Sequence, residues 1–251
     1  MDQNKIDKLA DLLNRLNQEG ATKELREEAL KLVTNIDPVE LSLAEQKLIQ
    51  DGMDPENLRH LCDVHMEVLS DELDKVKAQI STGHVIDTLI AEHNKIKDFL
   101  TELEAINFEI QKLNNKEDNP GLMKRLLELA ILILDAENHH LREENVLFPE
   151  LEKREITGPP RIMRMEHDAL RLRKRALKEA AENVNELDFN IFKELVDETS
   201  KYIVFNLRDH IYKEDHILYP TALERIIGSE IWDDMKIQCD KIGYCSFTPS
   251  V

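Results

Sequence analysis

The sequence predicts an all-α protein: a small helical N-terminal domain at residues 1–80, an up-down four-helix bundle at 84–227, and a short C-terminal helix with a tail at 228–251. Its composition favours long helices over sheets, because 33% of the residues are charged, 41% are hydrophobic and only seven are glycine. A repeated motif gives stronger support. The pattern His-x3-Glu-x3-Leu-aromatic-Pro occurs at residues 139–149 and again at 210–220. The histidine of a Glu-His pair precedes the first copy by 46 residues and the second by 43, so each unit has the length of a helical hairpin, and two hairpins make a bundle.

The N-terminal domain is predicted to contain four helices. Apolar residues recur with a helical period over residues 6–16, and Gly20 is placed to end that helix. A second helix is expected over about residues 22–35. Two more begin at the Asp-Pro pairs 37–38 and 54–55, because aspartate caps a helix well and proline fits its first turn.

The four bundle helices follow Gly83 in the sequence. They are expected at residues 85–114, from 120 through His139, at about 160–184 and at about 188–226. The Thr-Gly-Pro-Pro turn at 157–160 separates the two repeat units. Pro149 and Pro220 lie six residues beyond the glutamates of the motif and are expected to kink or end their helices. A last helix is expected around residues 229–241.

The repeated motif predicts a two-metal site. Residues four apart on a helix share one face at about 6 Å, so the histidine and glutamate of each copy can meet the same metal pair. With the upstream histidines, the predicted ligand set has four imidazoles and two carboxylates: His93, His139, Glu143, His167, His210 and Glu214. One His-x3-Glu pair alone would indicate a solvated helix surface. Two copies in matched apolar segments, each with a partner histidine, favour iron, manganese or zinc, which imidazole and carboxylate suit.

These residues resemble the haemerythrin-like cation-binding (HHE) domain over about residues 84–225, and within it the repair-of-iron-centres di-iron proteins. The resemblance implies a haemerythrin-like bundle in which the four histidines are terminal ligands and Glu143 and Glu214 bridge two iron ions. Each iron would have four bonds to the protein, which leaves room for an oxo or hydroxo bridge and for a small diatomic or peroxide ligand. Manganese or zinc could occupy the same ligands.

The sequence departs from oxygen-carrying haemerythrins in two ways. Those proteins have a fifth histidine one helical turn from another ligand, whereas Met163 and Arg171 flank His167 at that spacing here. Glutamate also stands where haemerythrin has a bridging aspartate. Reversible oxygen binding, the function of those haemerythrins, is therefore not inferred for this chain.

The N-terminal domain resembles a family of uncharacterised function that is found ahead of haemerythrin-like domains, on the evidence of residues 41–46 and 61–65. Repair-of-iron-centres proteins carry an N-terminal cysteine pair, but residues 1–80 contain only Cys62, which weighs against direct iron transfer of that kind. Cys62 and His65 are explained more simply by a buried thiol beside a surface histidine than by a transient iron or thiol site.

Charge and cysteine content exclude several classes of protein. The formal net charge of −18 argues against nucleic acid or an anionic membrane surface as a partner. No apolar run approaches the roughly 20 residues of a membrane span, and the N-terminus lacks the layout of a signal peptide. Three cysteines do not suggest a disulfide framework, and nothing in the spacing of Cys239 and Cys245 indicates a redox pair. A cytoplasmic location is expected.

Other residues near the motif are expected to lie outside the ligand set. His140 points about 100° away from His139 around the helix, so it is expected behind a ligand or at the surface. His216 and Tyr212, two residues from Glu214, are expected to face away from the metals. His84 lies near a helix start, as a cap or surface residue would.

Three hypotheses for function follow. The first is a non-haem di-iron protein that senses or reacts with oxygen, nitric oxide or peroxide, in iron handling or the stress response. The second is a regulatory module whose metal occupancy shifts the bundle and signals to a protein partner. The third is a di-iron oxidoreductase, which is the least favoured because the sequence offers no nameable substrate pocket or proton relay.

Overall fold

The computed structural model describes residues 80–249 and six isolated positions nearer the N-terminus, at residues 8, 11, 12, 15, 22 and 47. The four helices predicted for the N-terminal domain, and with them Cys62 and His65, therefore lie outside the described residues. No strand occurs among residues 80–249, which confirms the predicted all-α fold class. None of the helices in this range is long and apolar enough to cross a membrane.

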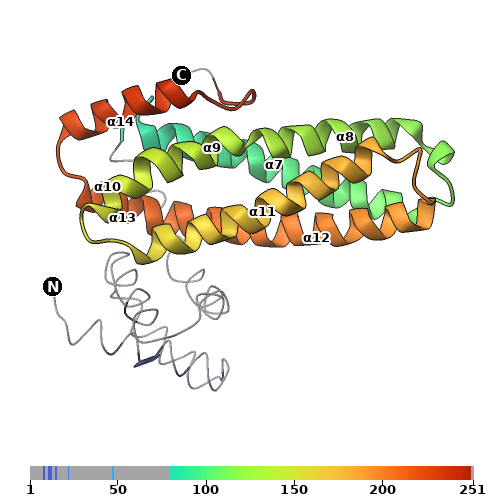
Figure 1. Cartoon of the computed structure of the whole chain (residues 1–251), viewed down its shortest axis with the longest axis horizontal. Helices are drawn as coiled ribbons and strands as arrows, with labels where there is room; N and C mark the ends of the chain where they lie inside the picture. The colour runs from blue at the N-terminus through green and yellow to red at the C-terminus, as the bar shows by residue number, and fades with distance from the viewer. Residues whose placement is uncertain are drawn as a thin grey trace.

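Four long helices run up and down in turn to form the bundle (Figure 1). They are α7 (Val85–Lys112), α8 (Pro120–Asp135), α11 (Gly158–Glu182) and α12 (Phe189–Lys213). Capping residues fix three of the starts. His84 accepts a hydrogen bond from the amide of Ile86, and Asn119 and Asp188 cap α8 and α12 in the same way. The predicted helix starts at residues 85, 120 and 188 are thus confirmed to within one residue, as is the capping role of His84.

The two helices that carry the repeated motif continue beyond it. After α8 the chain forms α9 (Glu137–Arg142), the π-helical segment η3 (Glu143–Leu147) and α10 (Phe148–Glu152). After α12 it forms the π-helical segment η4 (Glu214–Leu218) and α13 (Tyr219–Arg225).

The prolines were expected to kink or end their helices, and the second alternative was wrong, because the chain continues as α10 and α13. Each π-helical segment closes with a bond five residues back, from the amide of Phe148 to the carbonyl of Glu143 and from Tyr219 to Glu214. Proline then occupies the first turn of the next α-helical segment, where its missing N–H is tolerated. The wider π-helical turn directly before each proline lets the helix continue past the proline ring. Such turns are frequent at functional sites.

Two apolar cores fill the bundle, and the histidines lie between them. One core is built by the start of α7 with η3, α10, η4 and α13, and the other by the distal halves of the four long helices. Along α7, Ile90 belongs to the first core and Ile96 to the second, so His93 falls in the gap. The buried histidines of α9, α11 and α12 join His93 in a polar layer between the two apolar cores.

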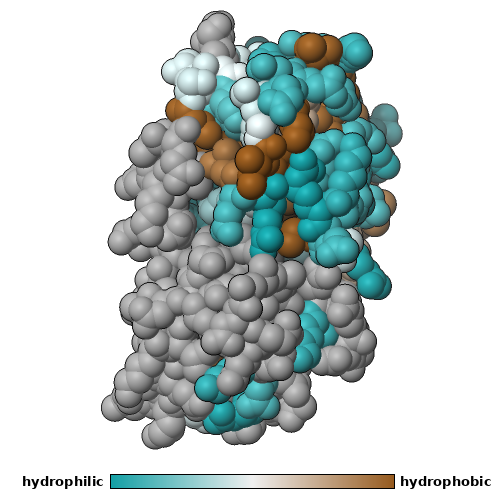
Figure 2. All heavy atoms as spheres, turned by 90° about the vertical axis from the view of Figure 1, so that its left-hand side faces the viewer, coloured by the Kyte–Doolittle hydropathy of each residue, from teal (hydrophilic) through white to brown (hydrophobic). Residues whose placement is uncertain are grey.

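The C-terminal helix α14 (Ser229–Ile242) lies over α7, α9 and η3 (Figure 1). Met235 and Cys239 join the first core, and Trp232 packs against it. Apolar residues are visible in the upper part of Figure 2, at the end of the molecule that α14 covers. Residues 243–249 then return without regular structure along α8 and α9. The helix predicted at 229–241 is confirmed, and the tail packs on the bundle.

Candidate metal centre

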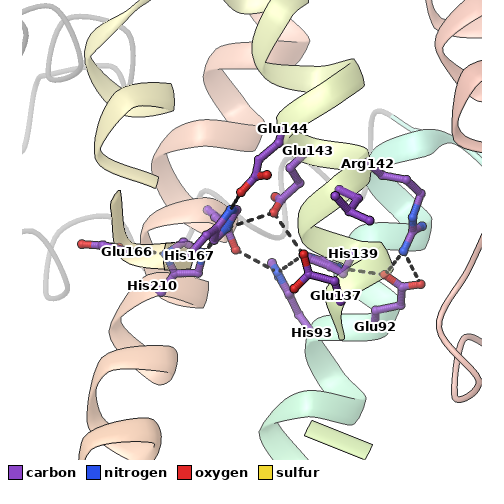
Figure 3. Close-up of polar contacts among 12 residues, drawn as sticks. Glu92, His93, Glu137, His139, Arg142, Glu143, Glu144, Glu166, His167 and His210 are labelled. Atoms are coloured by element: carbon purple, nitrogen blue, oxygen red, sulfur yellow. Dashed lines mark hydrogen bonds and ion pairs between the residues drawn. The ribbon is translucent and has the colours of Figure 1, made fainter. Parts of the chain in front are cut away.

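The structure brings the six predicted ligand side chains into one buried cluster between the helices. Figure 3 shows the four histidines and Glu143 of this cluster. The histidines form two pairs. The Nε2 atoms of His93 and His139 are 3.1 Å apart, and those of His167 and His210 are 2.9 Å apart. Each pair joins the two helices of one repeat unit, so the internal repeat of the sequence is also a repeat of geometry. The role of the histidines as metal ligands stays a prediction, and this geometry is compatible with it.

The two carboxylates lie between the histidine pairs. Oε2 of Glu143 is 3.5 Å from Nε2 of both His139 and His167, one histidine from each pair. Glu214 approaches the other two histidines, with Oε2 at 3.1 Å and Oε1 at 2.9 Å from their Nε2 atoms. Each carboxylate therefore spans both pairs, which is the placement that a bridging ligand requires.

Four further carboxylates hold the imidazoles from outside. Every Nδ1 atom is within hydrogen-bond distance of one of them: His93 with Asp215 at 2.7 Å, His139 with Glu92 at 2.7 Å, His167 with Glu144 at 2.7 Å, and His210 with Glu166 at 2.8 Å. A carboxylate partner fixes the proton on Nδ1 and turns the Nε2 lone pair inward. All four lone pairs then face the centre of the cluster. Two lone pairs about 3 Å apart repel each other unless a cation lies between them.

Each outer carboxylate is in turn paired with a cation. The pairs are Asp215 with Lys97 at 3.0 Å, Glu92 with Arg142 at 2.6 Å, Glu144 with Arg171 at 2.9 Å, and Glu166 with Lys213. These groups repeat at the same positions in both units. Lys97 and Arg171 follow the upstream histidine by four residues, and Arg142 and Lys213 directly precede the glutamate of the motif. Sequence reasoning missed this outer layer, although its repeated spacing was visible.

Buried carboxylate oxygens that lack hydrogen-bond partners indicate whether a cation fits the centre. Oε2 of Glu143 and both carboxylate oxygens of Glu214 are buried and have no hydrogen-bond partner among the described residues. Burial and the neighbouring Glu214 carboxylate raise the pKa of Glu143 well above its ordinary range. Bound dications would satisfy these oxygens and remove the mutual repulsion of the two carboxylates. The donor set and the orphaned oxygens therefore fit a two-cation site.

Tyr219 breaks the symmetry of the cluster. Its hydroxyl donates to Oε1 of Glu143 at 2.8 Å and lies 3.3 Å from Nε2 of His93, with the phenol ring stacked on that imidazole. The matching residue of the first repeat is Phe148, which stacks on His167 and has no hydroxyl. One half of the centre thus has a phenol beside its ligands and the other half has an apolar ring. Sequence analysis showed this position only as the aromatic residue of the repeated motif and assigned Tyr219 no role.

We expect Tyr219→Phe to lower the unfolding free energy of the metal-free protein by about 1–2 kcal/mol, because the buried Glu143 oxygen loses its donor. Metal content at saturation should stay as in the wild type, since every ligand remains. Urea titration and metal analysis check the two parts. The matched control is Tyr202→Phe, whose ring lies under the guanidinium of Arg173, away from the cluster. Loss of metal in Tyr219→Phe would show that the phenol is itself needed for binding.

His140 is fully buried, and the alternative that placed it at the surface was wrong. Its ring stacks on His167 at 3.9 Å, because the 100° turn from His139 points it at α11 rather than at solvent. Its Nδ1 atom has no hydrogen-bond partner, and one of its ring nitrogens lies with nitrogens of His167 and His210 in a group within 4.8 Å. Lys174, two turns after His167 on the same face, is a second interior polar residue, and burial lowers its pKa to about 8.

The remaining sequence candidates lie outside the cluster. His216 stacks on Tyr212, and Tyr212 lines a cavity of about 530 Å³ between α7 and α12 instead of facing the centre. Cys239 and Cys245 are buried free thiols. Burial raises the pKa of Cys239 to about 11 and that of Cys245 to about 12, which makes both poor nucleophiles.

Acid should destabilise the metal-free protein through Glu92 and Glu166. Burial opposes their ionisation, but hydrogen bonds from His139 and His210 and the neighbouring cations outweigh it and lower the pKa of both carboxyls from 4.5 to about 2. The unfolded chain binds more protons than the folded one in this interval. The stability due to these groups is therefore fully present above pH 4.5 and is lost as the pH falls towards 2.

We expect the urea midpoint of the metal-free protein to fall steeply over that interval, and the fall to be shallower in Glu92→Gln and Glu166→Gln. The matched control is Glu109→Gln, whose side chain is exposed and pairs with Lys112. A wild-type pH profile in both buried variants would contradict this assignment.

The fold and the cluster define a class of protein: a four-helix bundle with a buried cation site built from two His-Glu motifs. This chain belongs to the haemerythrin HHE cation-binding domain family, whose sequence model matches residues 84–222, more than half of the chain. Residues 9–75 match a family of unknown function, DUF438.

The chain is also similar to curated proteins named "Iron-sulfur cluster repair protein YtfE". The relative from Yersinia pseudotuberculosis serotype O:1b is 27% identical over 137 residues, which cover 52% of this chain and 61% of the relative. The relative from Yersinia pestis strain Pestoides F is 26% identical over 137 residues, with the same coverage. The chain thus spans about 61% of the length of these relatives.

Proposed function

We propose that this protein binds two iron ions at the His-Glu cluster and acts in iron handling during oxidative or nitrosative stress. The observation that carries the proposal is the placement of Glu143 and Glu214, each of which spans both histidine pairs. Four imidazoles with two carboxylates suit iron, while manganese or zinc could be held by the same donors. The cation-binding groups found among the described residues contain no thiolate, which argues against an iron–sulfur cluster.

His93 and His139 would hold one iron, His167 and His210 the other, and the two glutamates would join them. A di-iron centre held by these residues would supply reversible one-electron chemistry to a small molecule. The protein contributes the surroundings. The apolar cores above and below the polar layer keep bulk water out, and Tyr219 holds a proton 2.8 Å from Glu143. Such an enclosed site favours small ligands: oxygen, nitric oxide or peroxide.

The names of the relatives support a role in the repair of iron–sulfur clusters, in which the protein would supply or accept iron. The similarity covers 137 residues, 52% of this chain and 61% of the relative, at 27% identity, so this part of the proposal rests on part of the relative rather than on the whole of it. A protein partner that receives iron is part of the same proposal. The strongly acidic chain, with a net charge of −18, favours such a partner over nucleic acid or an anionic membrane.

The test uses the full chain, purified without oxygen and loaded with ferrous iron. Nitric oxide, oxygen and peroxide are added separately, and absorption and paramagnetic resonance spectra are recorded. We expect at least one of the three to change the spectrum in proportion to bound iron. Iron transfer is followed by reactivation of an apo iron–sulfur protein. Iron-loaded protein that reacts with none of the three and reactivates nothing would contradict the proposed function.

A metal-dependent regulatory module is the second candidate. The observation that favours it is a contact between the C-terminal tail and Glu92, the carboxylate that holds His139. Through this contact, a change in metal occupancy at the centre can alter how the tail packs on the protein surface.

A further inference from the structure

Residues 243–249, here called the C-terminal strap, are held on the bundle by contacts at several points. Gly243 has a φ of +93°, which turns the chain sharply after α14. The carbonyl of Tyr244 accepts a hydrogen bond from Nδ2 of Asn138 at 3.0 Å, and the amide of Ser246 donates to Asp135 at 2.6 Å. Phe247 meets the ring of Phe99 on α7 edge to face, at 5.1 Å between centroids. The strap therefore joins α7 to α8 and α9 from outside.

The strap also reaches the groups that hold one metal ligand. Oγ1 of Thr248 donates to Oε1 of Glu92 at 2.5 Å. Nη2 of Arg142 is 2.6 Å from both oxygens of the same carboxylate, and the Tyr244 ring lies 4.7 Å from the Arg142 guanidinium carbon. Figure 3 shows Glu92 between Arg142 and His139. The buried ion pair that orients His139 is thus covered and completed by the strap.

We propose that docking of the strap is coupled to metal binding at the His93–His139 half of the centre, with Thr248 as a positioning residue. Thr248 acts through Glu92, because a carboxylate that accepts from a hydroxyl, a guanidinium and an imidazole has one preferred orientation. Partners of this kind typically change metal affinity by about 10–100-fold. Coupling is reciprocal, so a metal that tightens the Glu92–His139 contact also tightens the strap.

The coupling is specific to one half of the centre. The polar contacts of the strap with the described bundle residues go to Asp135, Asn138, Arg142, Glu92 and the backbone of His139. The other histidine pair is held by Glu144 and Glu166, whose cations are Arg171 and Lys213. Release of one of the two metals should therefore depend on the strap, and release of the other should not. This inference rests on the proposed two-metal site.

Cys245 provides a reporter for strap docking. Its thiol is buried in the docked strap, 3.9 Å from Nη2 of Arg142, and becomes reactive only when the strap opens. Cys239 lies on α14 with its side chain in the first apolar core, and it serves as an internal reference. The experiment uses the full chain with Cys62→Ser. Alkylation by N-ethylmaleimide is followed at each cysteine by mass spectrometry, without metal and with ferrous iron.

We expect iron to slow alkylation of Cys245 by about tenfold or more and to leave Cys239 unchanged. Thr248→Val should abolish this protection and speed transfer of one of the two irons to a chelator by about tenfold, while Thr248→Ser should behave as the wild type. Equal alkylation of Cys245 with and without bound iron would overturn the coupling and leave the proposed function intact. Faster release of both irons in Thr248→Val would overturn its restriction to one half. Failure of the wild type to bind iron would overturn the proposed function and the coupling together.

Discussion

Replacing Glu143 with alanine is expected to reduce the metal content from two ions per chain to one or fewer. Glu143 contacts one histidine of each pair, so its loss removes a donor from both metals at once. The remaining bridge, Glu214, would face two dications alone. Metal analysis after dialysis against a weak chelator measures the loss, and Glu214→Ala should give the same result.

The matched control for this prediction is the neighbouring residue. Glu144 is also buried in part and also serves the centre, but only through the Nδ1 atom of His167. Glu144→Ala should therefore still bind two metals at saturation, with affinity lower by about 10–100-fold at one of them. If Glu143→Ala kept two metals at wild-type affinity, the assignment of a bridging carboxylate would be wrong.

Replacing Arg142 with alanine is expected to destabilise the metal-free protein by about 3–5 kcal/mol, which is the usual cost of breaking a buried ion pair. Arg142 and Glu92 are almost completely buried, and removal of the guanidinium leaves the carboxylate without its cation. Urea unfolding measures the effect. Arg125 provides the control, because its ion pair with Glu102 is equally short at 2.6 Å but about two fifths exposed, and Arg125→Ala should cost less than about 1 kcal/mol.

A double variant separates stability from function at the same position. Arg142→Met with Glu92→Leu replaces the ion pair by apolar side chains, so much of the lost stability should return. Metal affinity should nevertheless fall below that of Arg142→Ala, since only the double variant removes the carboxylate that orients His139. A single variant Arg142→Ala as stable as the wild type would contradict the importance of this buried pair for the fold.

The predictable part of the structure is the part that repeats. Each predicted ligand stands in a motif that occurs twice, and helical spacing alone places His139 with Glu143 and His210 with Glu214 on one face. Capping residues such as Asn119 and Asp188 mark helix starts from local chemistry, and the structure uses both as caps.

The unpredicted part depends on contacts between helices. Glu92 stands next to His93 in the sequence, yet it holds His139 on the opposite helix of the hairpin, and Asp215 holds His93 from the other repeat unit. Spacing within one helix does not reveal which imidazole each carboxylate meets. Thr248 lies 156 residues from Glu92, in a tail without periodicity, so no sequence pattern could bring them together.

The π-helical segments were missed for a different reason. Proline ordinarily interrupts an α-helix, and the motif places one six residues after each glutamate. Between each glutamate and its proline, the helical turn contains one extra residue and is π-helical. Glu143 and Glu214 are the first residues of these segments, η3 and η4. The same turn that admits the proline thus begins, in both repeats, at the glutamate that is predicted to bridge the metals.

The most direct test of the central claim is the metal content and metal geometry of the full chain purified without oxygen. We predict about two irons per chain, and X-ray absorption should show a second iron within about 3.5–4 Å of the first, as in two-metal sites. The first coordination shell should contain nitrogen and oxygen only. One metal per chain with no second metal at that distance, or sulfur in the coordination shell, would contradict the two-metal site described for His93, His139, Glu143, His167, His210 and Glu214.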